Sequence, residues 1–533
     1  MKMDDTELRA AYQYAVSQQE MWYRLYLECY KYAMPNRNNF WQVPQTARKN
    51  DVYMYDSTAL LAVRAFVAKT QSSLTPPGVN WCTLKSGSMV PDNDKEKVNE
   101  WLQILGNEIF DDLRQSNFDP VIAESFYDLA AGTAALYVKE MTDDPDCPFW
   151  FESVSLYLIA AYENSKGLLT NVFRRYRYMQ FYQIKTRFPY IKNWPEYIEK
   201  SIEKDPFGFF PMVDAWIDQE DGKFIHYVGN DQLNEIYFTS DPQESSPWIV
   251  FRWSRLPGET YGRGPLMDVI GDVKVCNKMM EQFIKQASLC VNPPYAYCSQ
   301  YLNTNNLTLE PGAMIAVQPI GGNMEALKPL FEPGNLQMGE WGFNKWWDNI
   351  NQGLYKNPLP SNSDPTKTAT EIEYTQQAYS QEVGPPVGRM QQECLNPLMK
   401  RLAYIKIRRG SLPKEIFPDS KYTRLSYQSP LVQNQKNTEL KSIETFVQAM
   451  AQIAGPEAPA GAMDIAKTIS KIAELTNVPL NIIKSEAEIQ QQQQAAQQQQ
   501  QQQHQAAMAQ AMSNVNQNNQ PNIPQGGSVL PAG

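Results

Sequence analysis

Apolar and aromatic residues recur at helical spacing over the first quarter of the chain. Between residues 5 and 33 they fall every three or four positions until Pro35 interrupts the pattern, which predicts one long N-terminal helix. The same spacing predicts further helices over residues 55–74, 95–113 and 120–131. The chain therefore opens with four helices.

From about residue 134 to residue 253 the pattern changes to short, alternating, β-rich runs separated by Gly, Asp, Asn and Pro. Such runs are typical of strands, so we expect an α+β block with a mostly antiparallel sheet. The run Arg174-Arg175-Tyr176-Arg177-Tyr178 can be interpreted as basic residues interleaved with aromatic ones for nucleic acid. A strand with one face in the core gives the same alternation, and we favour the strand.

Two long amphipathic helices are expected next. The first covers residues 266–289 and carries one apolar stripe; its roughly 25 residues would span about 37 Å. The second covers about 336–355. The segment between them, 291–335, is rich in Pro, Gly and Asn around small apolar clusters, which predicts a small, mixed, β-containing insertion.

The segment 357–365 contains three prolines and must be a loop. Thr368 and Glu371 have the spacing of a capping box, which would start another helix that ends at Arg409 and Gly410. Gly384-Pro385-Pro386 should kink or break this helix.

The C-terminal part contains two more predicted helices, over about 433–454 and 463–476. After Ile489 the chain turns to Gln, Ala and Asn repeats, which bury too little apolar surface to pack. We expect most of residues 490–533 to be disordered.

Composition narrows the class of protein. The chain has 533 residues, of which 42% are hydrophobic and 12% aromatic, so it is long enough for several cores. Its formal charge of −10 argues against a broad basic surface that grips nucleic acid. An acidic channel wall would instead let DNA slide, although the same acidity suits most cytosolic proteins.

Candidate chemistry is sparse. There are only two histidines, His226 and His504, and no phosphate-binding Gly-x-x-x-x-Gly-Lys-Ser/Thr loop. Seven cysteines occur without a Cys-x-x-Cys pair, the N-terminus lacks a signal peptide's apolar core, and no run of 18 apolar residues occurs. We therefore expect no metal, no cofactor, no membrane span and a protein that is soluble when made.

Two short motifs can be interpreted either as ordinary turns or as binding sites. The acidic run 143–146 could bind a hard cation but lacks the spacing of a calcium loop, so a solvated turn is favoured. Gly262-Arg263-Gly264 could face a phosphate, but a turn before Pro265 at the first position of a helix explains both glycines. We favour the turn here as well.

Several motifs occur in a characteristic order along the chain. They are Tyr55-Asp56-Ser57-Thr58-Ala59, Leu74-Thr-Pro-Pro77, Pro257-Gly-Glu-Thr-Tyr-Gly-Arg263, Asn292-Pro293 and Thr368-Ala-Thr-Glu371. With the predicted elements, they resemble the head-to-tail connector, or portal, proteins of T7-like short-tailed bacteriophages (the podovirus portal family) over about residues 10–490. The resemblance implies a mainly helical α+β portal fold, assembled as a ring, that acts as a DNA conduit and not as an enzyme.

The resemblance also implies a division of the chain into parts. They are a wing (1–255), a first stem helix (256–289), a clip (290–335), a second stem helix (336–355), a tunnel loop (356–368), a long wing helix and return (369–425), a helical crown (426–489) and a Gln-rich tail (490–533). The long helix with its double proline and the Gln-rich tail depart from the family pattern.

Site residues follow from the same resemblance. In the tunnel loop, Lys356, Asn357, Lys367 and Thr368 would border the DNA, with few contacts that do not depend on sequence. Tyr261, Gly262 and Arg263 would form the start of the first stem helix. Thr368 and Glu371 would cap the long helix.

Family members form a ring, usually a dodecamer, at one vertex of the viral shell, through which double-stranded DNA is packaged and ejected. The expected partners are therefore further copies of the chain, double-stranded DNA, the packaging terminase, the major capsid and scaffolding proteins, and the tail adaptor and nozzle proteins. The expected location is the portal vertex of the virion, after synthesis in the host cytoplasm.

Two rival interpretations remain open at this point. A carboxylate-dependent hydrolase would need two carboxylates converging in a cleft, and no spacing in the sequence indicates them. Another structural neck or tail adaptor of a virion would not need two stem helices flanking a clip. The number of subunits in the assembled particle would separate these alternatives.

Overall fold

A computed structural model describes most of the first 431 residues and a helix beyond them. The described residues are 2–35, 37, 54–87, 90–91, 95–142, 144, 147–219, 221–291, 295–298, 314–317, 327–329, 337–356, 386–410, 423–427, 430–454, 468 and 472. The chain divides into two compact units, Met1–Leu431 and Val432–Gly533. Of the second unit the structure describes mainly helix α11 (Pro430–Ala454), which confirms the helix predicted over 433–454.

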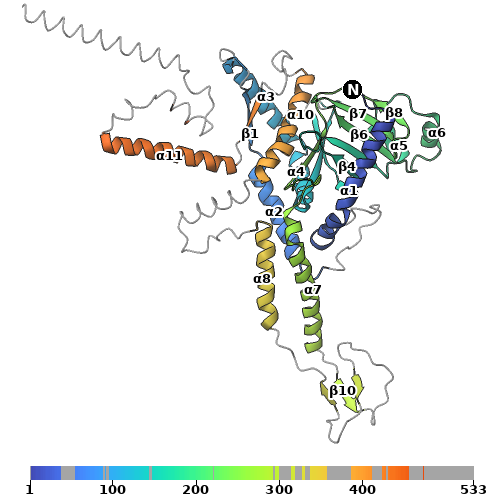
Figure 1. Ribbon diagram of the computed structural model, residues 1–533, viewed down its shortest axis with the longest axis vertical. Helices are drawn as coiled ribbons and strands as arrows, with labels where there is room; N and C mark the ends of the chain where they lie inside the picture. Colours follow the sequence, from blue (N-terminus) through green and yellow to red (C-terminus); the bar gives the residue numbers. More distant parts are fainter. Residues whose placement is uncertain are drawn as a thin grey trace, which may run out of the picture. The chain divides into compact units, whose positions relative to one another are not determined.

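The four predicted N-terminal helices are present in the first unit (Figure 1). They are α1 (Asp5–Ala33), α2 (Thr58–Leu74), α3 (Lys95–Gln115) and α4 (Phe118–Ala131). A capping box fixes the start of α1, because the Asp4 side chain accepts backbone N–H groups while the Asp4 N–H donates to Glu7 at 3.2 Å.

The β-rich block is antiparallel, as predicted, but it forms two sheets where one was expected. The smaller has the order β3-β2-β9, from Phe149–Ser153, Thr133–Glu140 and Trp248–Arg252. The larger runs β4-β5-β6-β7-β8, from Ile159–Tyr162, Asn171–Tyr176, Met212–Asp218, Phe224–Asn230 and Ile236–Thr239. A short 3₁₀ turn (Leu156–Leu158) precedes β4, and two helices, α5 (Phe181–Arg187) and α6 (Glu196–Lys204), lie between β5 and β6.

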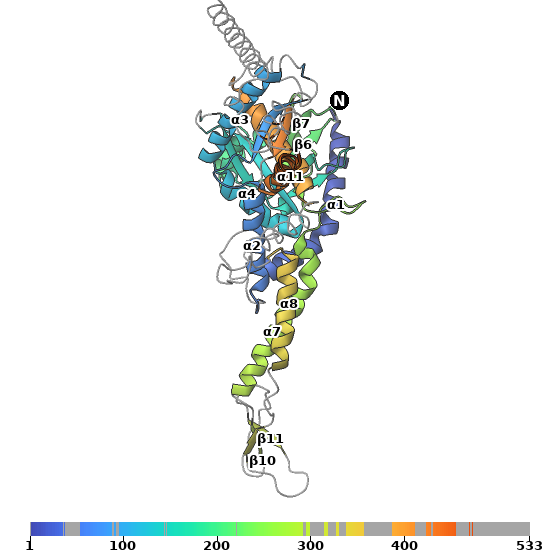
Figure 2. The same ribbon diagram turned by 90° about the vertical axis from the view of Figure 1, so that its left-hand side faces the viewer.

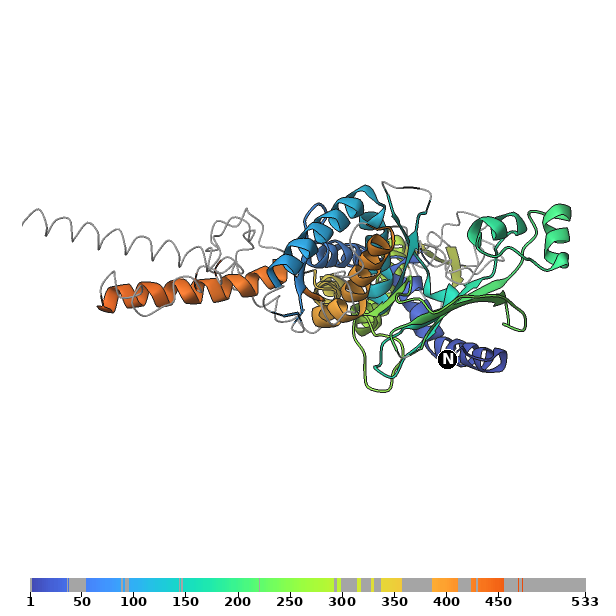
Figure 3. The same ribbon diagram turned by 90° about the horizontal axis from the view of Figure 1, so that it is seen from above.

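Helices cover both faces of the larger sheet (Figure 3). Leu8, Tyr12 and Ala15 of α1 pack against Phe173 and Val213 on one face. On the other face Met212 and Val228 pack against Ile184 of α5 and Ile198 of α6. The alternation of side chains in a strand lets β6 bury residues on both faces, so every residue of this strand except the last is buried, Asp214 included.

The Arg-rich run 174–178 begins in β5, which confirms the interpretation as a strand. Arg174 and Arg175 are both buried. Arg174 donates to Glu152 of β3 at 3.0 Å, and Arg187 of α5 donates to the same carboxylate at 3.0 Å. Arg175 donates to the carbonyl of Tyr157 at 2.5 Å and to the side chain of Gln19, which joins α1 to the sheet.

Two long helices, α7 (Pro265–Val291) and α8 (Gln337–Gly353), run side by side and project from the sheets (Figures 1 and 2). The rings of Phe283 and Phe343 meet across them, 5.7 Å apart. The predicted mixed insertion is present between them. Its strand β10 (Tyr295–Cys298) pairs parallel with β11 (Met314–Val317) and antiparallel with β12 (Leu327–Pro329).

The last part of the first unit combines helix and strand. Residues 386–390 are helical, a π-helix covers Gln391–Leu395, and α10 covers Asn396–Arg408. The described helix thus starts at Pro386, while the predicted cap at Thr368 and Glu371 lies outside the described residues. The strand β13 (Thr423–Tyr427) pairs antiparallel with β1 (Cys82–Ser86), a pairing that the sequence did not predict.

The carboxylate shared by Arg174 and Arg187 generates a pH prediction. Burial raises the pKa of Glu152, but the hydrogen bonds and charges of both arginines outweigh burial and lower the pKa from 4.5 to about 2. The stabilisation is therefore complete above pH 4.5 and is lost as the pH falls toward 2. Because this carboxylate is partly exposed, we expect Glu152→Gln to lower the free energy of unfolding at pH 7 by about 1–2 kcal/mol.

Urea denaturation of the unmodified chain and of Glu152→Gln at a series of pH values checks this expectation. The difference between their free energies of unfolding should shrink below pH 4.5. Glu196→Gln serves as the control, because Glu196 pairs with Lys200 at the surface, where the two side chains are 79% and 71% exposed, respectively. A difference for Glu152→Gln that does not change with pH would contradict the assignment.

Candidate functional site

The turn between β9 and α7 is the centre of the candidate site. The chain leaves β9, and Ser254 and Arg263 then exchange backbone hydrogen bonds of 3.1 and 2.9 Å, which closes residues 254–263 into a loop. Helix α7 begins two residues later at Pro265. The structure thus confirms the interpretation of Gly262-Arg263-Gly264 as a turn before a helix with proline at its first position.

Tyr261 and Gly262, predicted to form the start of the first stem helix, are held from the inside of the protein. Tyr261 is 1% exposed, and its hydroxyl accepts the Ala161 N–H at 3.0 Å. Burial raises the pKa of Tyr261 to about 12. The Gly262 N–H donates to the Thr133 hydroxyl and its carbonyl accepts from the Tyr26 hydroxyl, both at 2.8 Å.

The glycines of this turn are required by close backbone contacts. A Cβ at Gly262 would lie 2.5 Å from the carbonyl oxygen of Gly132, and one at Gly264 would lie 2.2 Å from that of Ala130. Gly132, at the end of α4, adopts a φ of +141°, where a side chain is strained as well. Three glycines therefore let the turn lie directly against the junction of α4 and β2.

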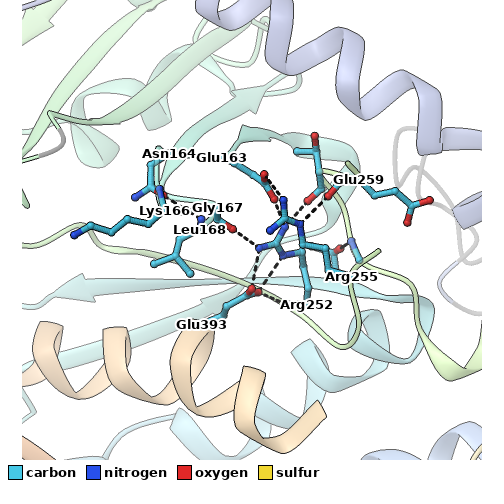
Figure 4. A network of polar contacts seen from close by, with 12 residues as sticks. Glu163, Asn164, Lys166, Gly167, Leu168, Arg252, Arg255, Glu259 and Glu393 are labelled. Carbon is cyan, nitrogen blue, oxygen red and sulfur yellow. Dashed lines mark hydrogen bonds and ion pairs between the residues drawn. The ribbon is translucent and has the colours of Figure 1, made fainter. Parts of the chain in front are cut away.

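A buried guanidinium lies directly before the turn (Figure 4). Arg252 ends β9, and its side chain is fully buried. Nε and Nη2 donate to the two carboxylate oxygens of Glu393 at 3.1 and 2.8 Å, and Nη1 donates to Glu163 at 2.5 Å. The carbonyls of Thr260 and Gly167 accept the remaining two bonds at 2.8 and 2.7 Å.

All five N–H donors of Arg252 are thus satisfied. Burial by itself would lower the pKa of Arg252, but the bonds and charges of Glu393 and Glu163 outweigh it and raise the pKa. Glu163 also accepts from Arg255 at 2.8 Å, and Arg255 Nε donates to the carbonyl of Glu259 at 3.1 Å. The network therefore ties the turn to the β4–β5 connection and to the π-helix.

The π-helix explains how Glu393 reaches the network. A π-helix adds a residue to the helical turn and changes the direction of the side chains in it. Glu393 lies in the middle of this segment and is 5% exposed, between the buried residues Met390 and Cys394. Sequence reasoning missed Glu393; the available signal was an acidic residue inside the apolar stripe of a helix.

Lys356, predicted to border DNA, directly follows a fixed end of α8. Tyr355 has a φ of +56°, and the Lys356 N–H closes the helix end on the Asn351 carbonyl at 2.7 Å. Lys69 of α2 donates to the Tyr355 carbonyl at 2.9 Å. The Tyr355 ring lies 5.8 Å from that of Trp253, the residue after Arg252.

The structure describes some of the predicted site residues and leaves others outside the described ranges. The structure brings Tyr261, Gly262 and Arg263 together in one turn, where Arg263 pairs with Glu259 at 2.6 Å and lies over the Trp22 ring at 5.3 Å. Lys356 is half-buried at the end of α8. Asn357, Lys367, Thr368 and Glu371 lie outside the described residues.

Two features are absent from the described residues. No group of three or more His, Cys, Asp or Glu residues in the described ranges is arranged to hold a metal ion. No helix in that part of the chain is both long and apolar enough to cross a membrane.

A turn held by a buried ion network, followed by two long helices around a small β insertion, defines a structural scaffold. The family of bacteriophage head to tail connecting proteins matches residues 5–483 of the chain. The chain is 22% identical over 472 residues to a probable portal protein of Bordetella phage BPP-1, covering 82% of this chain and 81% of that protein. It is 23% identical over 472 residues to a portal protein of Salmonella phage epsilon15, covering 83% and 82%.

A shorter match, 23% identical over 203 residues, links it to the portal protein of Escherichia phage T7 and covers 36% of this chain and 35% of that protein. The chain belongs to the family of bacteriophage head to tail connecting proteins. Its family makes it a portal of the T7-like type, a non-enzymatic structural component of the virion that forms the connector at the capsid vertex.

The network around Arg252 generates a stability prediction. Glu393→Gln removes the charge that compensates a fully buried guanidinium, so we expect the free energy of unfolding to fall by about 3–5 kcal/mol. Chemical denaturation of the full chain measures the change. Arg389→Gln is a matched control, because Arg389 binds the same carboxylate from a position that is 32% exposed, and it should cost less than about 1 kcal/mol. Equal effects of the two substitutions would rule out the assignment.

The close backbone contact at Gly264 generates a second stability prediction. Gly264→Ala would push a methyl group into the Ala130 carbonyl, so we expect a loss of about 3 kcal/mol or more in the free energy of unfolding. Gly271→Ala in α7, the helix that follows Gly264, is the control, since a Cβ there meets nothing within 4 Å. That change should be neutral or stabilising by up to about 1 kcal/mol. Thermal unfolding of both variants checks the order, and a Gly264→Ala protein as stable as the Gly271→Ala protein would refute it.

Proposed function

We propose that the chain forms a ring, a dodecamer, whose central channel carries double-stranded DNA into the capsid during packaging and out of it during ejection. The packaging terminase binds this ring first and the tail proteins bind it later. Family membership over residues 5–483 supports the proposal, and the observation that carries it is the helical hairpin of α7 and α8.

The two helices of this hairpin differ in their outward faces. On the inner side of α8, Phe343 and Ile350 are buried. Leu354, which directly follows the helix, is buried as well. Over residues 342–353, the part of α8 whose burial the structure describes, the exposed positions are all polar, and they are Asn344, Lys345, Asp348, Asn349 and Gln352. One lysine and one aspartate leave these five described positions without net charge. Such a surface hydrates well and holds phosphates weakly, which suits a wall that DNA must slide along.

The outward face of α7 is partly apolar instead. Val275 and Met279 are 43% and 41% exposed there. Apolar positions on an otherwise solvated helix favour contact with another protein surface. We therefore assign α8 to the channel side and the outer face of α7 to contacts between copies.

The remaining parts follow the same scheme. The wing covers 1–255, the stem helices cover 256–289 and 336–355, and the clip covers 290–335. The tunnel loop is 356–368, the long wing helix and return 369–425, the crown 426–489 and the tail 490–533. Lys356, Asn357, Lys367 and Thr368 border the DNA, and Thr368 and Glu371 cap the long helix. The fixed end of α8 supports this for Lys356, because it limits where that side chain can reach.

Shell assembly in vitro tests this function. Major capsid protein, scaffolding protein and terminase of the same phage are combined with DNA and ATP, with or without this chain. We expect nuclease-protected DNA inside the particles only when the chain is present. Lys356→Glu should lower the amount of protected DNA per particle, because a carboxylate at the channel repels phosphate.

Lys200→Glu is the matched control, since Lys200 lies on α6 and is 71% exposed. It should package as the unmodified chain does. Equal DNA protection with and without the chain would overturn the proposed function, whereas an unchanged Lys356→Glu protein would overturn only the assignment of that lysine.

A further inference from the structure

Residues 55–59 carry one of the characteristic motifs of the sequence and are not part of the site described above. They lead into α2, which lies beside that end of the α7–α8 hairpin which is nearest to the sheets (Figures 1 and 2). Their polar groups bind both helices of the hairpin. The inference drawn from these contacts rests on the proposed function, because it concerns how α8 is held beside the DNA.

The carboxylate of Asp56 joins α7 to α8. Its Oδ1 accepts the indole N–H of Trp347 in α8 at 3.3 Å, and its Oδ2 accepts the thiol of Cys276 in α7 at 3.4 Å. Cys276 is fully buried, and burial together with the charge of Asp56 raises the pKa of its thiol to about 12. The thiol therefore keeps the proton that it donates. The Thr58 hydroxyl also donates to Oδ1, at 2.9 Å, which fixes the rotation of the carboxylate.

The backbone of this segment binds α7 as well. The N–H groups of Tyr55 and Asp56 both donate to Oδ1 of Asn277, at 2.7 and 3.2 Å. The N-cap residue of α2, Ser57, forms no side-chain cap bond. The polar groups before α2 are thus directed at the hairpin and not at the first backbone N–H groups of their own helix.

The place of these contacts along the hairpin gives them leverage. The turn 254–263 holds the start of α7, and Asn277 lies about 18 Å further along the helix. Beyond Asn277 the helix continues for about another 21 Å to Val291. Lys274 pairs with Glu28 of α1 at 2.6 Å, but both side chains are partly exposed, so this pair restrains the helix weakly.

Trp347 passes the contact on to the interior of the hairpin. Its ring stacks on Phe343 at a centroid distance of 5.7 Å, and Phe343 contacts Phe283 of α7 at the same distance. Aromatic pairs of this kind add to the packing between two helices. A restraint on one helix of the hairpin therefore restrains the other.

We propose that Asp56 is a positioning residue that fixes the direction of the α7–α8 hairpin and thereby holds α8 at the path of the DNA. The network around Arg252 fixes where the hairpin starts, and the segment before α2 fixes where it points. A movement of about 1 Å at Asn277 would move Val291 by about 2 Å, because Val291 lies roughly twice as far from the start of the helix. The width of a channel that is built from such hairpins depends on this second point of attachment.

The distance between two spin labels tests the geometry. Label-bearing noncanonical residues replace Arg64 on α2 and Ser288 near the end of α7, which are both exposed. Pulsed electron–electron resonance reports their separation in the full chain, diluted with unlabelled chain so that only distances within one copy are measured. We expect one narrow distribution for the unmodified chain. In Asp56→Ala it should shift or broaden by about 2 Å or more, because the second attachment is lost.

Three further variants separate positioning from a general loss of stability. Asp56→Asn keeps an acceptor oxygen for the indole, so it should restore the narrow distribution. Trp347→Phe removes the indole N–H but keeps an aromatic ring, so it should broaden the distribution to a smaller extent, and it tests the same contact should the Asp56→Ala chain not fold. Glu281→Ala is the control, because that carboxylate binds Lys278 and Lys285 of its own helix; it should change nothing.

DNA packaging measures the consequence for the channel. In the shell assembly described above, we expect the Asp56→Ala chain to enter particles as the unmodified chain does. The amount of nuclease-protected DNA per particle should fall, because α8 is no longer held in one position. Asp56→Asn should restore the protected DNA, as it restores the distance.

The outcomes distinguish this inference from the function on which it rests. If particles protect DNA equally with and without the unmodified chain, the proposed function is wrong and the role of Asp56 at the DNA path falls with it, whereas the spin-label distances still test the hairpin. If Asp56→Ala keeps the narrow distribution, or if Asp56→Asn broadens it as much as Asp56→Ala does, the positioning role alone is wrong. A broadened distribution with unchanged DNA protection also overturns the inference, since the direction of the hairpin would then not matter to the channel.

Discussion

Arg252 joins the end of β9 and the turn that follows it to two segments that are far away in the chain. Its guanidinium binds Glu393 in the π-helix, Glu163 and Gly167 around the β4–β5 connection, and Thr260 in the turn before α7. A fully buried guanidinium is tolerated only when its donors are satisfied and its charge is compensated, so all four segments must be in place at once. The start of α7 and the position of the π-helix therefore depend on one side chain.

The consequences extend to the parts of the protein that we assign to DNA. The described chain stops at Lys356 and resumes at Pro386, and both flanks are fixed near the end of β9. Tyr355 contacts Trp253 on one flank, and Glu393 binds Arg252 on the other. Movement of one flank would thus be resisted by the same strand that holds the other. The turn 254–263 also leaves this strand, and Gly258, Glu259, Thr260 and Arg263 of this turn line a groove beside α1.

Local patterns in the sequence predicted the order of the elements. The helical spacing of 5–33, the alternation in the β-rich block and the proline at position 265 all act within a few residues, and the structure contains each element. The contacts between distant segments were not predicted. Arg252 and Glu393 are 141 positions apart, and the pairing of β1 with β13 depends on tertiary packing. The turn at Gly262 and Gly264 was predicted, but its contact with Gly132 required the fold.

Electron microscopy of the purified full chain, viewed along the particle axis, tests the central claim most directly. The account predicts a closed ring of about twelve copies with a central hole wide enough for duplex DNA and with α8 on the side of the hole. A compact particle without a channel, or a ring with α8 turned away from the hole, would contradict it.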